Sequence, residues 1–128
     1  MKNFTLIIGA VYGMLSVILG AFGAHAFKKV LSLERLTSFE TGVKYQMYHA
    51  LLLLIIGFFF KCDTGIEKWA SWCIILGVIF FSVSIYFLSF QEVWGVNLKF
   101  LGPITPIGGL LMITGWDLLI YVFTKTKF

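Results

Sequence analysis

The residues best suited to chemistry are the two histidines of the chain, His25 and His49, and one aspartate, Asp117. Two imidazoles on neighbouring helices at similar depth are the minimum for binding a haem iron, and they also suit proton transfer. Neither histidine has a cysteine or a carboxylate near it at metal-ligand spacing, and Ser82 and Ser84 lack the pattern of a hydrolytic triad. We therefore expect no enzyme active site, no metal site and no bound cofactor.

The stretch TGVKYQMYHALLLL, residues 41–54, places many polar side chains at the start of an apolar helix. Tyr45, Tyr48 and His49 share one helical face, and Gln46 shares the neighbouring face with His49. At a rise of about 1.5 Å per residue, His49 lies roughly 8–12 Å inside the polar end of this helix, where an unpartnered polar group is costly. These side chains either hydrogen-bond to neighbouring helices or line a pocket for a lipid headgroup, an ion or a proton.

The composition indicates that membrane-spanning elements position these residues. Apolar residues make up 59% of the 128 positions and charged residues only 12%, whereas soluble domains are about 45–50% apolar and about 25% charged. The formal net charge is +4, but the basic residues are scattered, which argues against nucleic-acid binding. We expect the lysines to lie at the ends of membrane spans and to contact the headgroups of membrane lipids.

Four segments are apolar and long enough to cross a membrane as helices, since a span needs about 20 residues. They predict spans at about 4–24, 44–60, 68–90 and 106–124 within a single transmembrane domain of residues 1–128. The predicted fold class is an all-α integral membrane four-helix bundle.

Capping patterns predict where the helices begin. Thr37 with Glu40 and Thr64 with Glu67 have the spacing of a capping box, and Thr105 precedes a proline suited to the first helical position. We therefore expect the second helix to begin near residue 38. Such a helix is longer than the hydrocarbon layer, so its first turns form an interfacial extension.

Small residues repeat along single faces of the predicted helices. Lipid provides little hydrophobic drive between helices, so their association depends on close packing. Small residues allow the backbones to approach closely, and a face that carries them is expected to be a packing seam. The expected packing positions are Gly9, Gly13, Ser16, Gly20, Gly77, Gly108 and Gly109. These seams serve either within one bundle or between copies, which leaves a homo-oligomer open.

An even number of spans brings distant motifs to one side of the membrane. With four crossings, the first helix ends where the second begins, and the third ends where the fourth begins. The motifs GAFGAHAF (20–27), FSVSIY (81–86) and LGPITPIGG (101–109) are therefore expected near the start of the second helix, with His25 as the candidate partner of His49. The predicted polar cluster comprises His25, Glu40, Tyr45, Gln46, Tyr48, His49, Ser82 and Thr105.

Asp117 is the one charged residue within the fourth predicted span. It lies roughly 10 Å from the end of the helix by helical rise, nearer the leaflet opposite the polar cluster. It shares a helical face with Ile113 and Tyr121, and we expect this face to point into the bundle. Such an acid either has a functional role, or is satisfied by taking a proton or by a hydrogen bond to Tyr12 or a lysine.

Charge does not decide the orientation of the chain. The side with both termini carries five basic residues, Lys2, Lys61, Lys68, Lys125 and Lys127, and the other side also carries five, Lys28, Lys29, Arg35, Lys44 and Lys99. The positive-inside rule therefore favours neither orientation.

The motifs GAFGAHAF, FETGVKYQMYHALLLL, FSVSIY and LGPITPIGG, with the pair Gly115–Trp116, resemble the YgdD/YwdK-like family of small, uncharacterised multi-pass bacterial membrane proteins. The resemblance covers nearly the whole chain. It implies a protein of the cytoplasmic (cell) membrane with about four spans, and it implies no known activity. The family's motif residues fall largely on the predicted polar cluster, whereas Asp117 is not part of the family pattern.

Two functional hypotheses follow from these patterns. The first is a non-enzymatic packed bundle that binds a lipid headgroup or a membrane partner protein through the polar cluster. The alternative is a small transporter or proton-relay component that uses His25 and His49.

Overall fold

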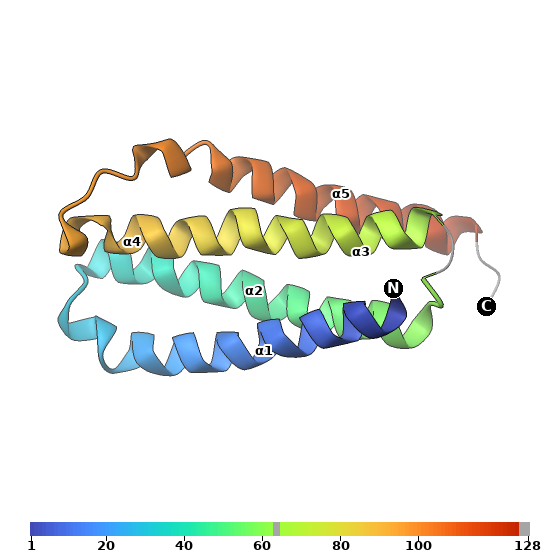
Figure 1. Ribbon diagram of the computed structural model, residues 1–128, viewed down its shortest axis with the longest axis horizontal. Helices are drawn as coiled ribbons and strands as arrows, with labels where there is room; N and C mark the ends of the chain where they lie inside the picture. The colour runs from blue at the N-terminus through green and yellow to red at the C-terminus, as the bar shows by residue number, and fades with distance from the viewer. Residues whose placement is uncertain (63–64, 126–128) are drawn as a thin grey trace.

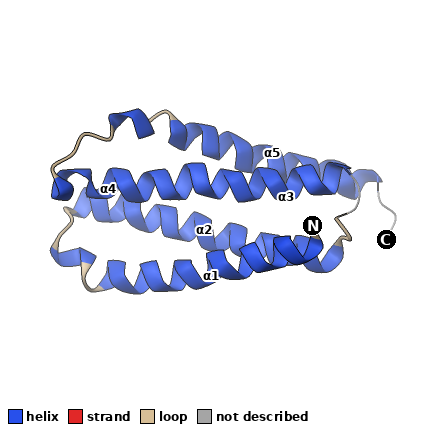
Figure 2. Cartoon of the chain, viewed as in Figure 1, coloured by secondary structure: helices blue, strands red, loops and turns tan. Residues whose placement is uncertain are grey.

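The computed structural model describes residues 1–62 and 65–125, and within them the chain forms helices and no strand (Figure 2). The long helices are α1 (Lys2–Ala24), α2 (Leu33–Phe59), α3 (Gly65–Val78), α4 (Ser84–Trp94) and α5 (Ile104–Lys125). Three short helical turns accompany them, η1 (Phe27–Lys29), η2 (Ile79–Val83) and η3 (Lys99–Leu101).

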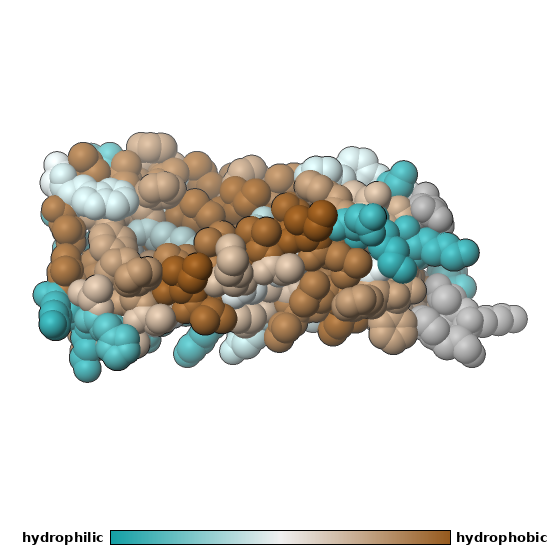
Figure 3. All heavy atoms as spheres, turned by 60° about the horizontal axis from the view of Figure 1, so that its bottom comes forward, coloured by the Kyte–Doolittle hydropathy of each residue, from teal (hydrophilic) through white to brown (hydrophobic). Residues whose placement is uncertain are grey.

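The helices form four segments that are long and apolar enough to cross a membrane, because α3, η2 and α4 continue into one another. The segments are Lys2–Ala24, Leu33–Phe59, Gly65–Trp94 and Lys99–Lys125. They lie side by side as a bundle, with the start of α1 and the end of α5 at the same end (Figure 1). On the face in Figure 3, apolar atoms cover the middle and hydrophilic atoms gather mostly toward the ends. The predicted all-α four-helix bundle is confirmed.

α2 begins earlier than the capping pattern predicted. Ser32 is its N-cap, and the Ser32 hydroxyl accepts a hydrogen bond from the Arg35 backbone N–H at 3.3 Å. Thr37 lies inside the helix, where its hydroxyl donates to the Leu33 carbonyl at 2.9 Å. The 27 residues of α2 span about 40 Å, more than the ~30 Å of the hydrocarbon layer, so its first turns extend into the headgroup region.

Of the other two predicted helix starts, one differs from the structure and one lies partly outside the described residues. Thr105 lies inside α5, which begins at Ile104, and its hydroxyl pairs with Ser84 Oγ at 2.6 Å instead of capping the helix. Pro106 is tolerated in this first turn because the amides there have no partner within the helix. The predicted pair of Thr64 and Glu67 lies partly outside the described residues.

Glycines allow two pairs of helices to approach closely. A Cβ at Gly9 of α1 would lie 3.1 Å from a backbone oxygen of α2. A Cβ at Gly77 of α3 would lie 2.5 Å from Met112 of α5, and one at Gly108 would lie only 2.3 Å from the Phe81 backbone nitrogen. At these positions the predicted seams coincide with close helix contacts.

The remaining small residues of the predicted seams are less tightly enclosed. For Gly13, Gly20 and Gly109, the nearest atom to an added Cβ would be 3.9, 3.7 and 3.8 Å away. Ser16 is buried, and its hydroxyl donates to the Tyr12 carbonyl of its own helix at 2.8 Å. The spacing of small residues thus indicates the packed face but not how closely each position is packed.

η2 is a π-helical turn, in which an extra residue is fitted into the continuous helix from α3 to α4. α5 crosses it at Gly108, whose lack of a side chain lets the two backbones touch at Phe80 and Phe81. The Ser84 hydroxyl also contacts the carbonyls of Phe80 and Phe81. Such turns often mark functional sites, so the residues around η2 are candidates for a binding site.

The polar motifs lie at two depths rather than one. The end of α1, the start of α2 and the end of α4 lie at one end of the bundle, whereas α5 begins farther in, with Thr105 beside Ser84, the first residue of α4 (Figure 1). Residues 81–86, however, lie within the continuous span Gly65–Trp94 rather than at its end. His49 follows Leu33, the first residue of α2, by 16 positions, or about 24 Å of helix. His49 therefore lies farther from the first residue of α2 than a helix start near residue 38 implied.

Candidate functional site

His49 is buried, and both of its ring nitrogens are hydrogen-bonded. Nδ1 lies 2.7 Å from the Tyr45 carbonyl oxygen, and Trp116 Nε1 of α5 donates to Nε2 at 3.1 Å. A carbonyl oxygen only accepts and an indole N–H only donates, so Nδ1 carries the proton and the ring is neutral. Neither nitrogen can bind a metal or pass a proton unless one of these bonds breaks.

A pocket of about 300 Å³ adjoins His49 beside the π-helical turn. It is lined by Tyr45, His49, Phe81, Gly109, Met112, Ile113 and Trp116. Because the imidazole nitrogens are already paired, the pocket presents mainly aromatic and aliphatic surface. This surface suits hydrocarbon better than an ion.

Gln46 lies at the centre of a set of hydrogen bonds between helices. Its side chain is 3% exposed; Nε2 donates to the Tyr12 carbonyl of α1 at 2.9 Å, and Oε1 accepts from the Tyr86 hydroxyl of α4 at 2.6 Å. The Tyr12 hydroxyl in turn donates to the Ile75 carbonyl of α3 at 2.8 Å. The nitrogen and the oxygen of the Gln46 amide therefore each join α2 to a neighbouring helix.

Hydroxyl groups join the other helices in the same way. Ser82 of η2 donates to the Gly42 carbonyl of α2 at 2.8 Å, and Ser84 of α4 pairs with Thr105 of α5. Buried polar groups need such partners in a membrane. The arrangement accounts for Gln46, Ser82 and Thr105 as residues that fix how the helices pack.

The predicted polar cluster does not form one site. His25 is the C-cap residue of α1 and is exposed, and Glu40 and Tyr48 are exposed on α2. The partner predicted for His49 was His25, but Trp116 takes that place. Four crossings bring helix ends together, yet they do not determine which side chains meet.

Asp117 lies on the outer face of α5. The expectation that this face points into the bundle is wrong, because Asp117 is exposed and its neighbours Ile113 and Tyr121 are 64% and 47% exposed. Tyr12, one of its predicted partners, donates to Ile75 instead. The buried face of α5 carries Gly108, Met112, Gly115, Leu119 and Val122.

Arg35 lies between two adjoining pockets at the end of the bundle where α2 begins. One pocket, of about 320 Å³, is lined by Arg35 with Ser38, Leu88, Ser89, Thr105 and Pro106, among others. The second, also about 320 Å³, shares Arg35 and Ser89 and includes Glu92. Arg35 Nη2 donates to Glu92 Oε1 at 2.9 Å, and the two side chains are 32% and 66% exposed.

The pocket of Arg35, Ser38, Ser89 and Thr105 combines a cation with hydroxyl groups, and we call it the Arg35 pocket. A guanidinium group has five N–H donors in a planar fork that matches the oxygens of phosphate and carboxylate groups. The bond to Glu92 uses one of its two terminal nitrogens. The Arg35 pocket can therefore receive an anionic group.

The sequence patterns missed Arg35 and Ser89. Arg35 and Glu92 are 57 positions apart, so no local motif relates them. One available indication is that Arg35 is the single arginine beside nine lysines. Arginine is favoured over lysine where an anion is held in a fixed geometry.

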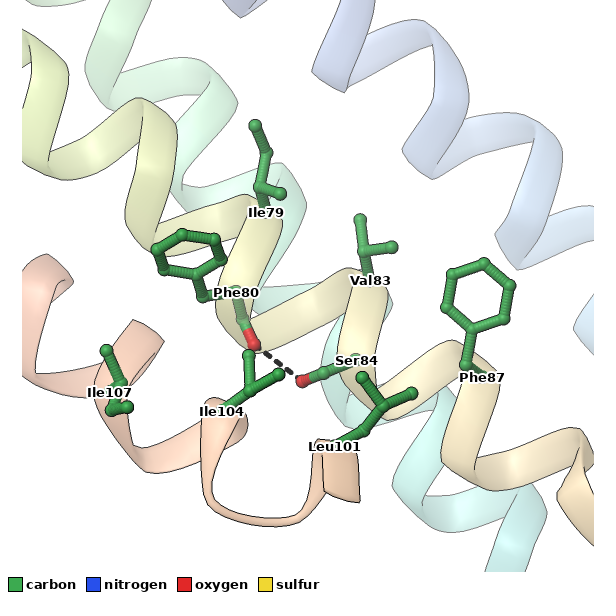
Figure 4. A pocket seen from close by; sticks show the side chains of 8 residues that line it. All are labelled: Ile79, Phe80, Val83, Ser84, Phe87, Leu101, Ile104 and Ile107. Carbon is green, nitrogen blue, oxygen red and sulfur yellow. Dashed lines mark hydrogen bonds between the residues drawn. The ribbon is translucent and has the colours of Figure 1, made fainter. Parts of the chain in front are cut away.

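An apolar pocket of about 360 Å³ lies between the helix from η2 to α4 and the segment from η3 to α5 (Figure 4). Its walls include Ile79, Phe80, Val83, Phe87 and Ile104. The one polar side chain in this view, Ser84, is turned to the Phe80 carbonyl (Figure 4). The pocket therefore fits hydrocarbon and offers no group that would select a particular headgroup.

Comparison with known proteins identifies relatives over the full length of the chain. The family described as a protein of unknown function (DUF423) matches residues 19–109. The chain is 47% identical to a UPF0382 membrane protein of Staphylococcus haemolyticus over 94% of this chain and 93% of the relative. It is 43% identical to a UPF0382 membrane protein of Staphylococcus epidermidis over 100% and 98%, and 38% identical to the UPF0382 membrane protein YwdK of Bacillus subtilis over 98% of each. No solved structure shows a significant match.

Proposed function

The chain belongs to the DUF423 family of UPF0382 membrane proteins, and we propose that it is a non-enzymatic protein of the cytoplasmic membrane that binds an anionic lipid headgroup. The ligand group is a phosphate held beside Arg35. The observation that carries the proposal is the Arg35 pocket at the end of the bundle, where α2, α4 and α5 meet.

The polar side of the Arg35 pocket supplies donors for a phosphate. Arg35 is one-third exposed and is oriented by Glu92 at 2.9 Å, which fixes the guanidinium plane without using all its donors. Ser38 adds a hydroxyl group from α2, whereas the Thr105 hydroxyl is already paired with Ser84 and contributes only to the wall of the pocket. Charge-assisted hydrogen bonds of this kind are about twice as strong as neutral ones.

The apolar side of the same pocket suits the rest of a lipid. Ile85, Leu88 and Pro106 also line it. A headgroup bound at Arg35 would leave the glycerol and acyl chains against these residues. The basic residues at this end, Lys28, Lys29, Arg35, Lys44 and Lys99, outnumber the acidic residues Glu34, Glu40 and Glu92, which adds a general attraction for anionic lipid.

Native mass spectrometry of the chain from mild detergent tests the proposal, with phosphatidylglycerol and phosphatidylcholine offered together. We expect preferential retention of phosphatidylglycerol, and we expect Arg35→Gln to weaken it about tenfold, which corresponds to ~1.4 kcal/mol. The fold should survive this change, because an exposed ion pair contributes only about 0–1 kcal/mol. Excess inorganic phosphate separates the two possible sources of the anion, since it displaces the lipid only if the site takes free phosphate.

Lys44→Gln is the matched control, because Lys44 is an exposed basic residue of α2 that does not line the Arg35 pocket. It should retain most of the lipid preference. Equal retention of both lipids by the native chain, or equal losses in Arg35→Gln and Lys44→Gln, would refute a specific site.

The geometry gives less support to a proton relay through the two histidines. His25 is exposed at the end of α1, whereas both nitrogens of His49 are hydrogen-bonded about 24 Å along α2. Polar residues between them, such as Gln46, already join helices. A headgroup site at Arg35 does not require a proton path between His25 and His49.

A further inference from the structure

α5 carries two seams with the same spacing on opposite faces. The buried seam packs in the bundle and consists of Gly108, Met112, Gly115, Leu119 and Val122, which follow one another by alternating steps of four and three. A second set follows the same alternation two positions later: Leu110, Thr114, Asp117, Tyr121 and Thr124. All five of these side chains are exposed, and we call them the outer seam.

The outer seam is unusually polar for a helix surface that faces lipid. Leu110 is followed by two threonines, an aspartate and a tyrosine. Asp117 precedes Lys125, the last residue of α5, by eight positions, or about 12 Å, which is too far for its short side chain to reach the headgroups. Polar and charged residues within a membrane almost always face protein or water.

The two strongest polar groups of the outer seam have no hydrogen-bond partner within the described part of the chain. No hydrogen bond or ion pair there reaches the Asp117 carboxylate, and no hydrogen bond reaches the Tyr121 hydroxyl. Thr114 and Thr124 donate to carbonyls of their own helix, at 2.8 and 2.7 Å. An acceptor and a donor one helical turn apart therefore remain to be satisfied from outside the chain.

We infer that the outer seam is the interface between two copies of this chain, in which Tyr121 of each copy donates to Asp117 of the other. Steps of four and three average 3.5 residues, the repeat that keeps one face against a partner helix along a left-handed pair. In a parallel pair related by a two-fold axis, each residue of the seam meets the equivalent residue and its neighbours one turn away. Helix side chains lean toward the N-terminus, which brings Tyr121 of one copy to the level of Asp117 of its partner.

Complementarity of donors and charges favours a second copy over another partner. The outer seam supplies both the acceptor and the donor, so two identical seams can form two equivalent hydrogen bonds, one from each Tyr121 to the Asp117 of the other copy. The Lys125 ammonium lies 5.7 Å from the centre of the Tyr121 ring on the same face. The two lysines of a pair thus balance the two carboxylates in number, eight positions farther along each α5.

Disulfide cross-linking in vesicles of native-like lipid tests the inference. Thr114→Cys places a thiol on the outer seam, and two-fold symmetry brings the two thiols together. We expect it to form cross-linked dimers, whereas Val17→Cys, at a 63% exposed position of α1, and the native cysteines Cys62 and Cys73 serve as controls that do not. Asp117→Leu in the Thr114→Cys chain should lower the cross-linked fraction at least about fivefold.

Asp117→Leu is not expected to harm the fold of the single chain, because Asp117 is exposed and its carboxylate makes no hydrogen bond or ion pair within the described residues. Asp117→Asn keeps an acceptor and should retain most of the cross-linking, while Tyr121→Phe should lose it as Asp117→Leu does. Cross-linking of Thr114→Cys no greater than that of Val17→Cys would overturn the inference. The inference would also be overturned if Thr114→Cys cross-linked only to a different protein, or if neither Asp117→Leu nor Tyr121→Phe lowered the cross-linked fraction.

Discussion

At the scale of single residues, hydrogen bonding explains why a membrane helix carries Gln46 and His49. Each polar atom of these two side chains has a partner on another helix or on the preceding turn. The sequence predicted that such groups need partners, but Tyr86 and Trp116 lie 40 and 67 positions away from them. Their pairing depends on how the helices are rotated against one another, which no local pattern contains.

The bond from Trp116 to His49 leads to a prediction about the imidazole tautomer. Because Trp116 donates to Nε2 at 3.1 Å, we expect His49 in the lipid-embedded protein to be neutral with its proton on Nδ1. Nitrogen NMR of the labelled chain distinguishes the two ring nitrogens. Trp116→Phe removes the donor and should shift only the Nε2 signal, and a proton found on Nε2 in the native chain would contradict the assigned bond.

At the scale of helices, the small-residue stripes predicted which faces pack, and the capping patterns misplaced two of the starts. Thr37 and Glu40 have the right spacing for a capping box, but Ser32 begins α2 five residues earlier. A local capping pattern can recur inside a helix, where its hydroxyl bonds to the preceding turn. The π-helical turn η2 was not predicted; it lies where α5 approaches closely at Gly108, a tertiary contact that no local pattern contains.

Two adjacent glycines of α5 offer a matched test of that contact. A Cβ at Gly108 would lie 2.3 Å from the Phe81 nitrogen, whereas one at Gly109 would have no neighbour closer than 3.8 Å. Gly108→Ala should destabilise the bundle by about 1–3 kcal/mol through overpacking. Gly109→Ala should be neutral or stabilising by up to about 1 kcal/mol, because alanine favours helix.

Unfolding of both variants in mixed detergent micelles measures the difference between them. Equal stabilities for Gly108→Ala and Gly109→Ala would mean that α5 does not approach η2 as closely as described.

At the scale of the whole molecule, the composition and four apolar segments were sufficient to predict the bundle, and the even number of crossings predicted which helix ends meet. That meeting point, rather than the predicted cluster around His49, is where the Arg35 pocket lies. The pocket was missed because its residues come from separate helices and form no motif. The orientation is not determined by charge, since the two sides carry five basic residues each.

The four-span arrangement can be tested by the accessibility of single introduced cysteines to a membrane-impermeant maleimide in sealed vesicles. Lys28→Cys and Lys99→Cys lie beside the ends that form the Arg35 pocket, and Lys2→Cys and Lys125→Cys lie at the opposite end (Figure 1). We predict that the first two are labelled from one compartment and the last two from the other. Labelling of positions 28 and 99 from opposite compartments would contradict the four-span bundle and, with it, the Arg35 site.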